Sequence, residues 1–117
     1  MNLFWKKNKE YVNFLDLTPI KEYEHEFLDG GFINILIPKF KSRFMVENIM
    51  PRLKSPYIKA KLDEFGSAVW LLIDGYRNVD EISQKLIEKF GDRIQPVHER
   101  TTRFLSLLHS HKMIKFK

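Results

Sequence analysis

The chain has 117 residues, 44% of them hydrophobic, which fits one domain with a real core and excludes disorder of the whole chain. It has no cysteine, which excludes disulfides, thiolate zinc sites and cysteine nucleophiles and suits a reducing cytoplasm, where we expect the protein. The net charge of +5 invites a nucleic-acid partner, but the excess lies in residues 1–61, with 11 basic against 7 acidic residues, and not in the later half. No apolar run is long enough to span a bilayer, and the N-terminus lacks the pattern of a signal peptide.

The first part of the chain reads as an appendage. Residues 1–21 mix aromatic and basic side chains without a regular period, and Pro19 ends the stretch. We expect an N-terminal basic and aromatic arm over residues 1–21, packed on the domain or on a partner, and a domain over residues 22–117.

A β-hairpin is predicted next. Tyr23, His25 and Phe27 alternate with glutamates, which is the period of a strand with one polar face. The run Asp29-Gly30-Gly31 supplies residues that adopt positive φ in a tight turn, and Phe32–Ile37 is the returning strand.

The chain then returns to the sheet through a basic connection (residues 39–56). Apolar residues at 44, 45, 49 and 50 indicate a short helix there, limited by Pro51 and Pro56. A third strand is predicted at Tyr57–Leu62, with Ile58, Ala60 and Leu62 on one face.

From residue 63 the period becomes helical. Helices are expected over Glu64–Ile73, from the cap Asn78 to Gly91, and after Pro96, and a short strand over residues 113–116 ends the chain. The third helix would place Val97, Thr101, Phe104, Leu105 and Leu108 on its core side. This order predicts an α+β, winged helix-turn-helix-like domain, in which a three-stranded antiparallel sheet is followed by a three-helix bundle.

No constellation of catalytic residues is found. The segment His98–Thr102 resembles a zinc-protease helix, but Thr102 stands where the second ligand must be, and no glycine-rich phosphate loop is present. We therefore expect no catalytic residue, no metal and no cofactor, and a binding protein in place of an enzyme.

The best candidate for a binding surface combines a strand edge and a helix face. The strand Tyr57–Leu62 lies at a sheet edge in this reading, and Arg100, Arg103 and Leu107 lie beside the core stripe of the third helix. Together they would form a groove suited to an extended peptide. The alternative is that these basic residues simply form a solvated face.

The helical part of the sequence resembles a known family. The run from Leu62 to Gly75, followed by Asn78-Val79-Asp80-Glu81-Ile82, is similar to the PqqD family, and Phe104-Leu105, Leu108 and Met113-Ile114 match its final helix and tail. The resemblance covers about residues 20–117. Two features depart from the family: the N-terminal arm and the length of the connection at residues 41–56.

The resemblance implies a peptide chaperone, or RiPP recognition element, that captures the leader of a ribosomally made precursor peptide by strand addition. It would present that leader to a modifying enzyme, often a radical SAM enzyme. The peptide-binding residues carried over by position are Tyr57, Ile58, Lys59, Ala60, Lys61, Leu62, Arg100, Arg103, Phe104 and Leu107.

Two other functions remain in view. One is a DNA-binding winged-helix transcriptional regulator, supported by the helical trio and by Arg100 and Arg103 on the third helix, with Glu99 among them as the opposing observation. The other is a scaffolding subunit that uses the arm. In the preferred reading the partners are a leader peptide and its enzyme, with no specific nucleic acid and no membrane.

Overall fold

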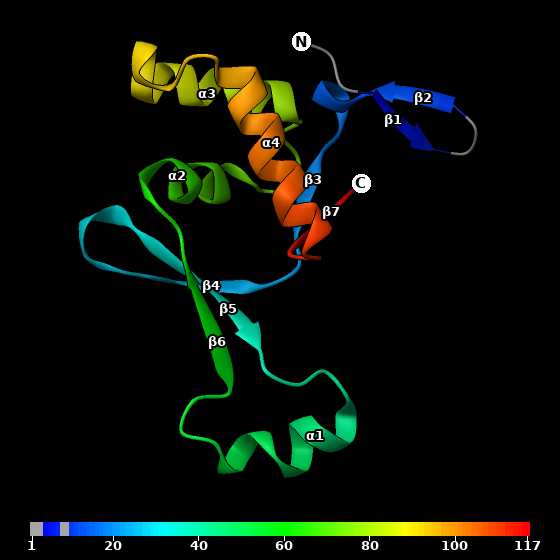
Figure 1. Cartoon of the computed structure of the whole chain (residues 1–117), viewed down its shortest axis with the longest axis vertical. Coiled ribbons are helices and arrows are strands. Elements are labelled where there is room, and N and C mark those ends of the chain that lie inside the picture. The colour runs from blue at the N-terminus through cyan, green and yellow to red at the C-terminus, as the bar shows by residue number, and fades with distance from the viewer. Residues whose placement is uncertain (1–3, 8–9) are drawn as a thin grey trace. The chain divides into compact units, whose positions relative to one another are not determined.

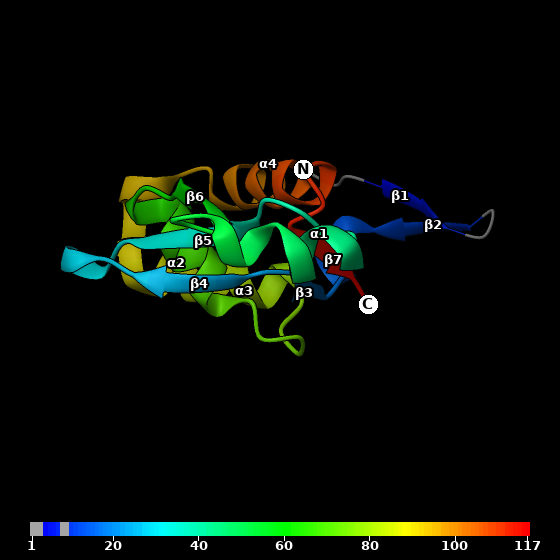
Figure 2. The same ribbon diagram turned by 90° about the horizontal axis from the view of Figure 1, so that it is seen from below.

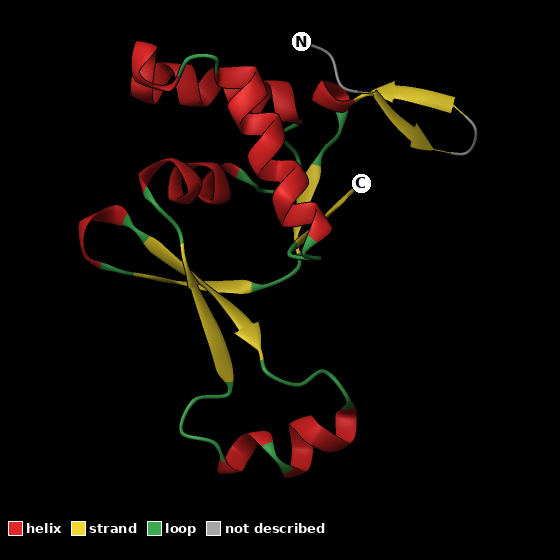
Figure 3. Ribbon diagram, in the orientation of Figure 1, coloured by secondary structure: helices red, strands yellow, loops and turns green. Residues whose placement is uncertain are grey.

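The computed structural model describes residues 4–7 and 10–117 of the chain. These residues form two compact units. One, which we call the sheet unit, is Tyr23–Glu64; the other, the helical unit, joins the described residues up to Glu22 with Phe65–Lys117. Figure 3 shows the helices and strands along the chain.

The sheet unit contains the three-stranded antiparallel sheet that the sequence predicts. Its strands are β4 (Glu24–Phe27), β5 (Ile33–Pro38) and β6 (Tyr57–Lys61), with β5 in the centre, as Figure 2 shows. The turn between β4 and β5 passes through Gly30 and Gly31 at φ of 80° and 84°, which explains the two glycines. The predicted hairpin is confirmed.

The basic connection between β5 and β6 forms the predicted short helix. Helix α1 (Arg43–Asn48) begins at Ser42, whose hydroxyl oxygen accepts a hydrogen bond from the backbone N–H of Met45 at 3.2 Å. A 3₁₀ turn, Met50–Arg52, follows. The backbone N–H of Lys39 donates to the carbonyl of Pro56 at 2.9 Å, which closes the base of the connection.

The helical unit contains the three predicted helices, α2 (Glu64–Leu72), α3 (Val79–Phe90) and α4 (Val97–Ser110), which Figure 1 labels. Their inward faces supply the core of this unit, in which Val69, Trp70, Ile82, Leu86 and Leu105 are fully buried. Because these residues recur at helical spacing, burying one face of each helix removes a continuous apolar surface from water. The α+β class with a three-stranded sheet followed by three helices is confirmed.

The same unit also contains strands that the sequence did not reveal. The predicted C-terminal strand is present as β7 (Ile114–Phe116), and it pairs antiparallel with β3 (Pro19–Lys21). Before β3 come the hairpin β1 (Phe4–Lys7) and β2 (Glu10–Asn13) and a 3₁₀ turn at Phe14–Asp16. Phe14 is buried, and the centre of its ring lies 5.3 Å from the centre of the Phe116 ring.

Part of the N-terminal arm thus packs within the helical unit. Residues 1–3 and 8–9 of that arm lie outside the described residues. The division into an arm over 1–21 and a domain over 22–117 stays a prediction.

Side-chain caps organise the link between α2 and α3. The Asp74 carboxylate accepts from the backbone N–H groups of Arg77 at 2.8 Å and Tyr76 at 2.9 Å, and these hydrogen bonds hold the pKa of Asp74 below its usual value. Helix α3 then begins with a capping box. The Asn78 side chain accepts from the Glu81 backbone at 2.8 Å, while the Glu81 carboxylate accepts from the Asn78 backbone at 3.0 Å.

We predict that Asn78→Ala lowers the free energy of unfolding by about 1 kcal/mol, because an N–H group in the first turn of α3 loses its acceptor. Urea unfolding followed by circular dichroism measures this change. The control is Gln84→Ala, at an exposed position of the same helix, which should leave stability nearly unchanged. Equal stability of Asn78→Ala and the unmodified protein would contradict the role of the cap.

Candidate functional site

One candidate binding feature is the edge strand β6 of the sheet unit. Its register on β5 places Lys61 opposite Asn34, Lys59 opposite Leu36 and Tyr57 opposite Pro38. At one end, the backbone N–H of Leu62 donates to the carbonyl of Ile33 at 3.0 Å. At the other end, Pro56 accepts from Lys39. The two bonds thus flank β6, and on the β6 side each involves an even-numbered residue, Leu62 or Pro56.

The alternation of an antiparallel pair decides where the remaining backbone groups point. Hydrogen-bonded and non-hydrogen-bonded pairs alternate along such a ladder, so Ile58 and Ala60 direct their N–H and C=O groups toward β5. Those of Tyr57, Lys59 and Lys61 point away from β5. At Tyr57 both outward groups are engaged by the Ser55 hydroxyl, at 3.1 Å and 3.4 Å.

The outward backbone N–H and C=O groups of Lys59 and Lys61 therefore form the unpaired part of this edge. In the part of the chain that the structure describes, β5 is the only strand paired with β6. The side chains of the two lysines are held within the sheet unit: Lys59 forms a 3.1 Å ion pair with Glu26, and the Lys61 ammonium lies 5.4 Å from the centre of the Phe32 ring. Ile58 is 56% exposed, so an apolar side chain stands in solvent beside these backbone groups.

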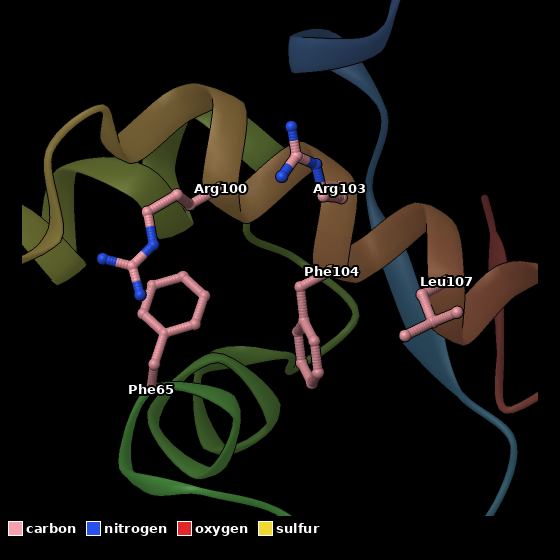
Figure 4. Close-up of a pocket in the computed structure, with 5 residues that line it drawn as sticks. All are labelled: Phe65, Arg100, Arg103, Phe104 and Leu107. Atoms are coloured by element: carbon pink, nitrogen blue, oxygen red, sulfur yellow. The ribbon is translucent and has the colours of Figure 1, made fainter.

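A separate candidate feature, a pocket of about 230 Å³, lies within the helical unit. We call it the α4 pocket. Phe65 of α2 forms one side, and residues of α4 form the rest, as Figure 4 shows. The lining residues are Phe65, Arg100, Arg103, Phe104 and Leu107.

Aromatic packing shapes the α4 pocket. The rings of Phe65 and Phe104 meet edge to face with their centres 6.2 Å apart, and Phe65 also lies 6.4 Å from Phe90. The guanidinium of Arg100 lies over the Phe65 ring, 4.8 Å from its centre. One of its N–H groups also points to the backbone carbonyl of Arg93, at 3.4 Å.

The two arginines of the pocket differ in their electrostatic surroundings. Arg103 is 79% exposed at its side chain and lies 3.7 Å from the Glu99 carboxylate, one turn earlier on α4. Arg100 is half-buried, and no carboxylate among the described residues forms an ion pair with it. The pocket therefore offers an apolar wall with one uncompensated positive charge, a combination suited to an apolar group beside an anion.

The structure brings together four of the predicted site residues, namely Arg100, Arg103, Phe104 and Leu107. Phe104, which the sequence places on the core side of the third helix, is half-buried, and its ring packs on Phe65. Phe65 is the pocket residue that sequence reasoning missed. The available signal was an aromatic residue in the first turn of α2, at the edge of the apolar stripe. Tyr57–Leu62 belong to the sheet unit, and the predicted groove that would include them stays a prediction.

The histidine of the degenerate zinc-protease pattern has a different partner. A ring nitrogen of His98 lies 2.9 Å from a carboxylate oxygen of Asp80 on α3, so the pair links two helices. Among the described residues, no three histidine or acidic side chains cluster in a way that could hold a metal ion. In the same part of the chain, no helix combines the length and apolar character needed to cross a membrane.

We predict two classes of proline variants in β6. Ile58→Pro and Ala60→Pro each remove a hydrogen bond to β5 and should lower the free energy of unfolding by about 1–3 kcal/mol. Lys59→Pro and Lys61→Pro remove only outward N–H groups and should cost less, since the exposed ion pair of Lys59 is worth about 0–1 kcal/mol. Urea unfolding of the four variants separates the classes; equal losses at all four positions would show that the register is wrong.

Comparison with known proteins supports the resemblance noted in the sequence. No curated protein matches the chain in this comparison, and no solved structure does. One family model matches, coenzyme PQQ synthesis protein D (PqqD), over residues 57–114. The match begins at the first residue of β6 and ends at the first residue of β7, so it includes the strand edge of the sheet unit and the α4 pocket of the helical unit. The family is one of non-catalytic accessory proteins. Through residues 57–114, the chain belongs to the PqqD family.

Proposed function

We propose that this chain is a non-catalytic peptide-binding chaperone. It captures the leader of a ribosomally made precursor peptide by strand addition and presents it to a modifying enzyme, for which a radical SAM enzyme is the expected class. The family model carries the name of coenzyme PQQ synthesis, so a client in that synthesis is the first to test. Any short precursor gene found beside the gene of this chain would define a further client to test.

One observation carries this proposal: the outward backbone groups of Lys59 and Lys61 on the edge of β6. An extended peptide that pairs with these groups gains main-chain hydrogen bonds that do not depend on its sequence. The Lys59 side chain pairs with Glu26, and the Lys61 ammonium lies near the Phe32 ring, so neither side chain covers the backbone between them. The charge of the two lysines opposes self-association of the edge.

The α4 pocket supports the proposal by supplying selectivity. Main-chain pairing alone cannot distinguish one peptide from another, whereas a pocket can select a side chain. In our proposal an apolar residue of the leader packs against Phe65, Phe104 and Leu107. An aspartate or glutamate of the leader pairs with Arg100, whose charge lacks a carboxylate partner among the described residues.

We predict a change in amide hydrogen exchange that is specific to the strand edge. In the free protein, the N–H groups of Ile58 and Ala60 should exchange slowly and those of Lys59 and Lys61 quickly, because only the former bond to β5. Adding a synthetic leader should slow exchange at Lys59 and Lys61. NMR detection resolves each residue.

The matched test uses Lys59→Pro and Lys59→Ala. The proline variant should fold and lose affinity for the leader, whereas the alanine variant keeps the backbone N–H and should bind nearly as well. Leader binding with no change in exchange at either lysine would contradict strand addition. Nanomolar binding to one specific DNA duplex at physiological salt would favour a regulator in its place.

We further predict that Arg100→Gln weakens leader binding by about 1–2 kcal/mol, because a half-buried charged hydrogen bond is lost. Arg103→Gln is the control, since Arg103 is exposed and already near Glu99. A double-mutant cycle with Asp→Asn or Glu→Gln changes in the leader identifies the paired carboxylate by calorimetry. Equal effects of the two arginine variants would rule out a special role for Arg100.

A further inference from the structure

The basic connection (residues 39–56) carries most of the net charge of the chain. It contains five basic residues against one acidic residue, so it accounts for four of the five net positive charges. The family match begins at residue 57, directly after it. The connection is therefore a feature of this chain outside the matched segment, and its charge is concentrated on a short stretch of surface in the sheet unit.

Most of this charge is not neutralised within the sheet unit. Arg43 pairs with Glu47 at 2.9 Å, and the Lys41 ammonium lies 5.3 Å from the centre of the Tyr23 ring. The side chains of Lys39, Arg52 and Lys54 form no ion pair among the residues that the structure describes. These three cations are available to an acidic partner.

Helix α1 adds exposed apolar groups to the same surface. Phe44 is 67% exposed and Val46 is 40% exposed. Residues two apart on a helix point about 200° apart, so these side chains do not form one apolar stripe. A single aromatic side chain that stands out among cations is typical of an anchor that enters a pocket on a folded protein. A helix that lies on a membrane needs a continuous apolar face instead.

The position of the connection in the sheet unit also matters. The hydrogen bond from Lys39 to Pro56 closes its base next to Tyr57, the first residue of β6. A protein held by the connection would therefore lie beside the Tyr57 end of the open edge. Any peptide paired with Lys59 and Lys61 would have one of its ends directed toward that protein.

We propose that the basic connection is the docking surface for the enzyme that acts on the client peptide, through an acidic patch on that enzyme around an apolar pocket that takes Phe44. This inference rests on the proposed function for the identity of the partner. Charge complementarity brings the two proteins together, and the buried aromatic ring holds them. Nucleic acid would also pair with the cations, but phosphate contacts make no use of an exposed Phe44 and Val46.

The test begins with site-specific photo-crosslinking in the native host. The variant Phe44→p-benzoylphenylalanine should crosslink to one protein, identified by mass spectrometry, whose contact region is acidic. The control is Tyr76→p-benzoylphenylalanine, at an aromatic position of the helical unit that is 81% exposed. The same crosslink from both positions, or crosslinks to lipid or nucleic acid in place of protein, would overturn the proposal.

The identified enzyme is then purified, and its affinity for the full chain is measured by calorimetry. Phe44→Ala should weaken this affinity by about tenfold or more, and neutralisation of Lys39, Arg52 and Lys54 to glutamine should weaken it further and remove most of its salt dependence. Unchanged affinity of Phe44→Ala overturns the proposal. Binding to phosphatidylglycerol vesicles or to a DNA duplex that Phe44→Ala abolishes would also overturn it.

A separate measurement distinguishes this proposal from the proposed function. Phe44→Ala should bind the synthetic leader within about twofold of the unmodified protein, and the leader should still slow exchange at Lys59 and Lys61. Loss of enzyme docking with retained leader binding supports the inference. Absence of leader binding in the unmodified protein would remove the proposed function but leave the docking result to stand by itself.

Discussion

The pairing of β6 with β5 is the interaction on which the candidate site depends. Two prolines limit the register of this pair. Pro38 lies in a non-hydrogen-bonded pair with Tyr57, where no N–H group is needed, and Pro56 takes part only as an acceptor. A slip of one residue would move Pro38 into a position that requires a donor and would reverse which backbone groups face the open edge. The same constraint that stabilises the hairpin therefore determines that Lys59 and Lys61 present their main-chain groups outward.

The α4 pocket depends on a different kind of interaction, the packing of Phe65 against three neighbours on α3 and α4. Contacts with Phe90 and Phe104 hold the ring in place, and the ring in turn holds the Arg100 guanidinium over its face. A cation held in this way loses part of its hydration before any ligand arrives, so it pairs more strongly with a carboxylate than a freely solvated arginine would. An apolar wall and a cation without a carboxylate partner among the described residues are thus built from one cluster of side chains.

The chain combines a family segment with a part of its own. Residues 57–114 contain the open strand edge and the helices, whereas the basic connection precedes them and holds nearly all of the net charge. This arrangement separates two tasks physically. In the proposed function, main-chain pairing and pocket contacts would act on a peptide over a short range, and the charge of the connection would act on a partner surface over about a Debye length, roughly 8 Å at physiological ionic strength. Within the sheet unit, the open strand edge and the basic connection meet at the Tyr57 end of β6.

Local patterns in the sequence determined the elements of this fold. The alternation before Gly30 and Gly31 identified the hairpin, the Asn78 cap identified the start of α3, and the helical period identified all three helices of the helical unit, because each depends on neighbours close in sequence. Tertiary structure alone decided that β7 pairs with Pro19–Lys21, since the two strands lie more than ninety residues apart and are three residues long each. It also decided that Phe65 and Phe104 form a pocket while Trp70 is fully buried. Periodicity shows which residues share a face, but the extent of burial depends on what packs against that face.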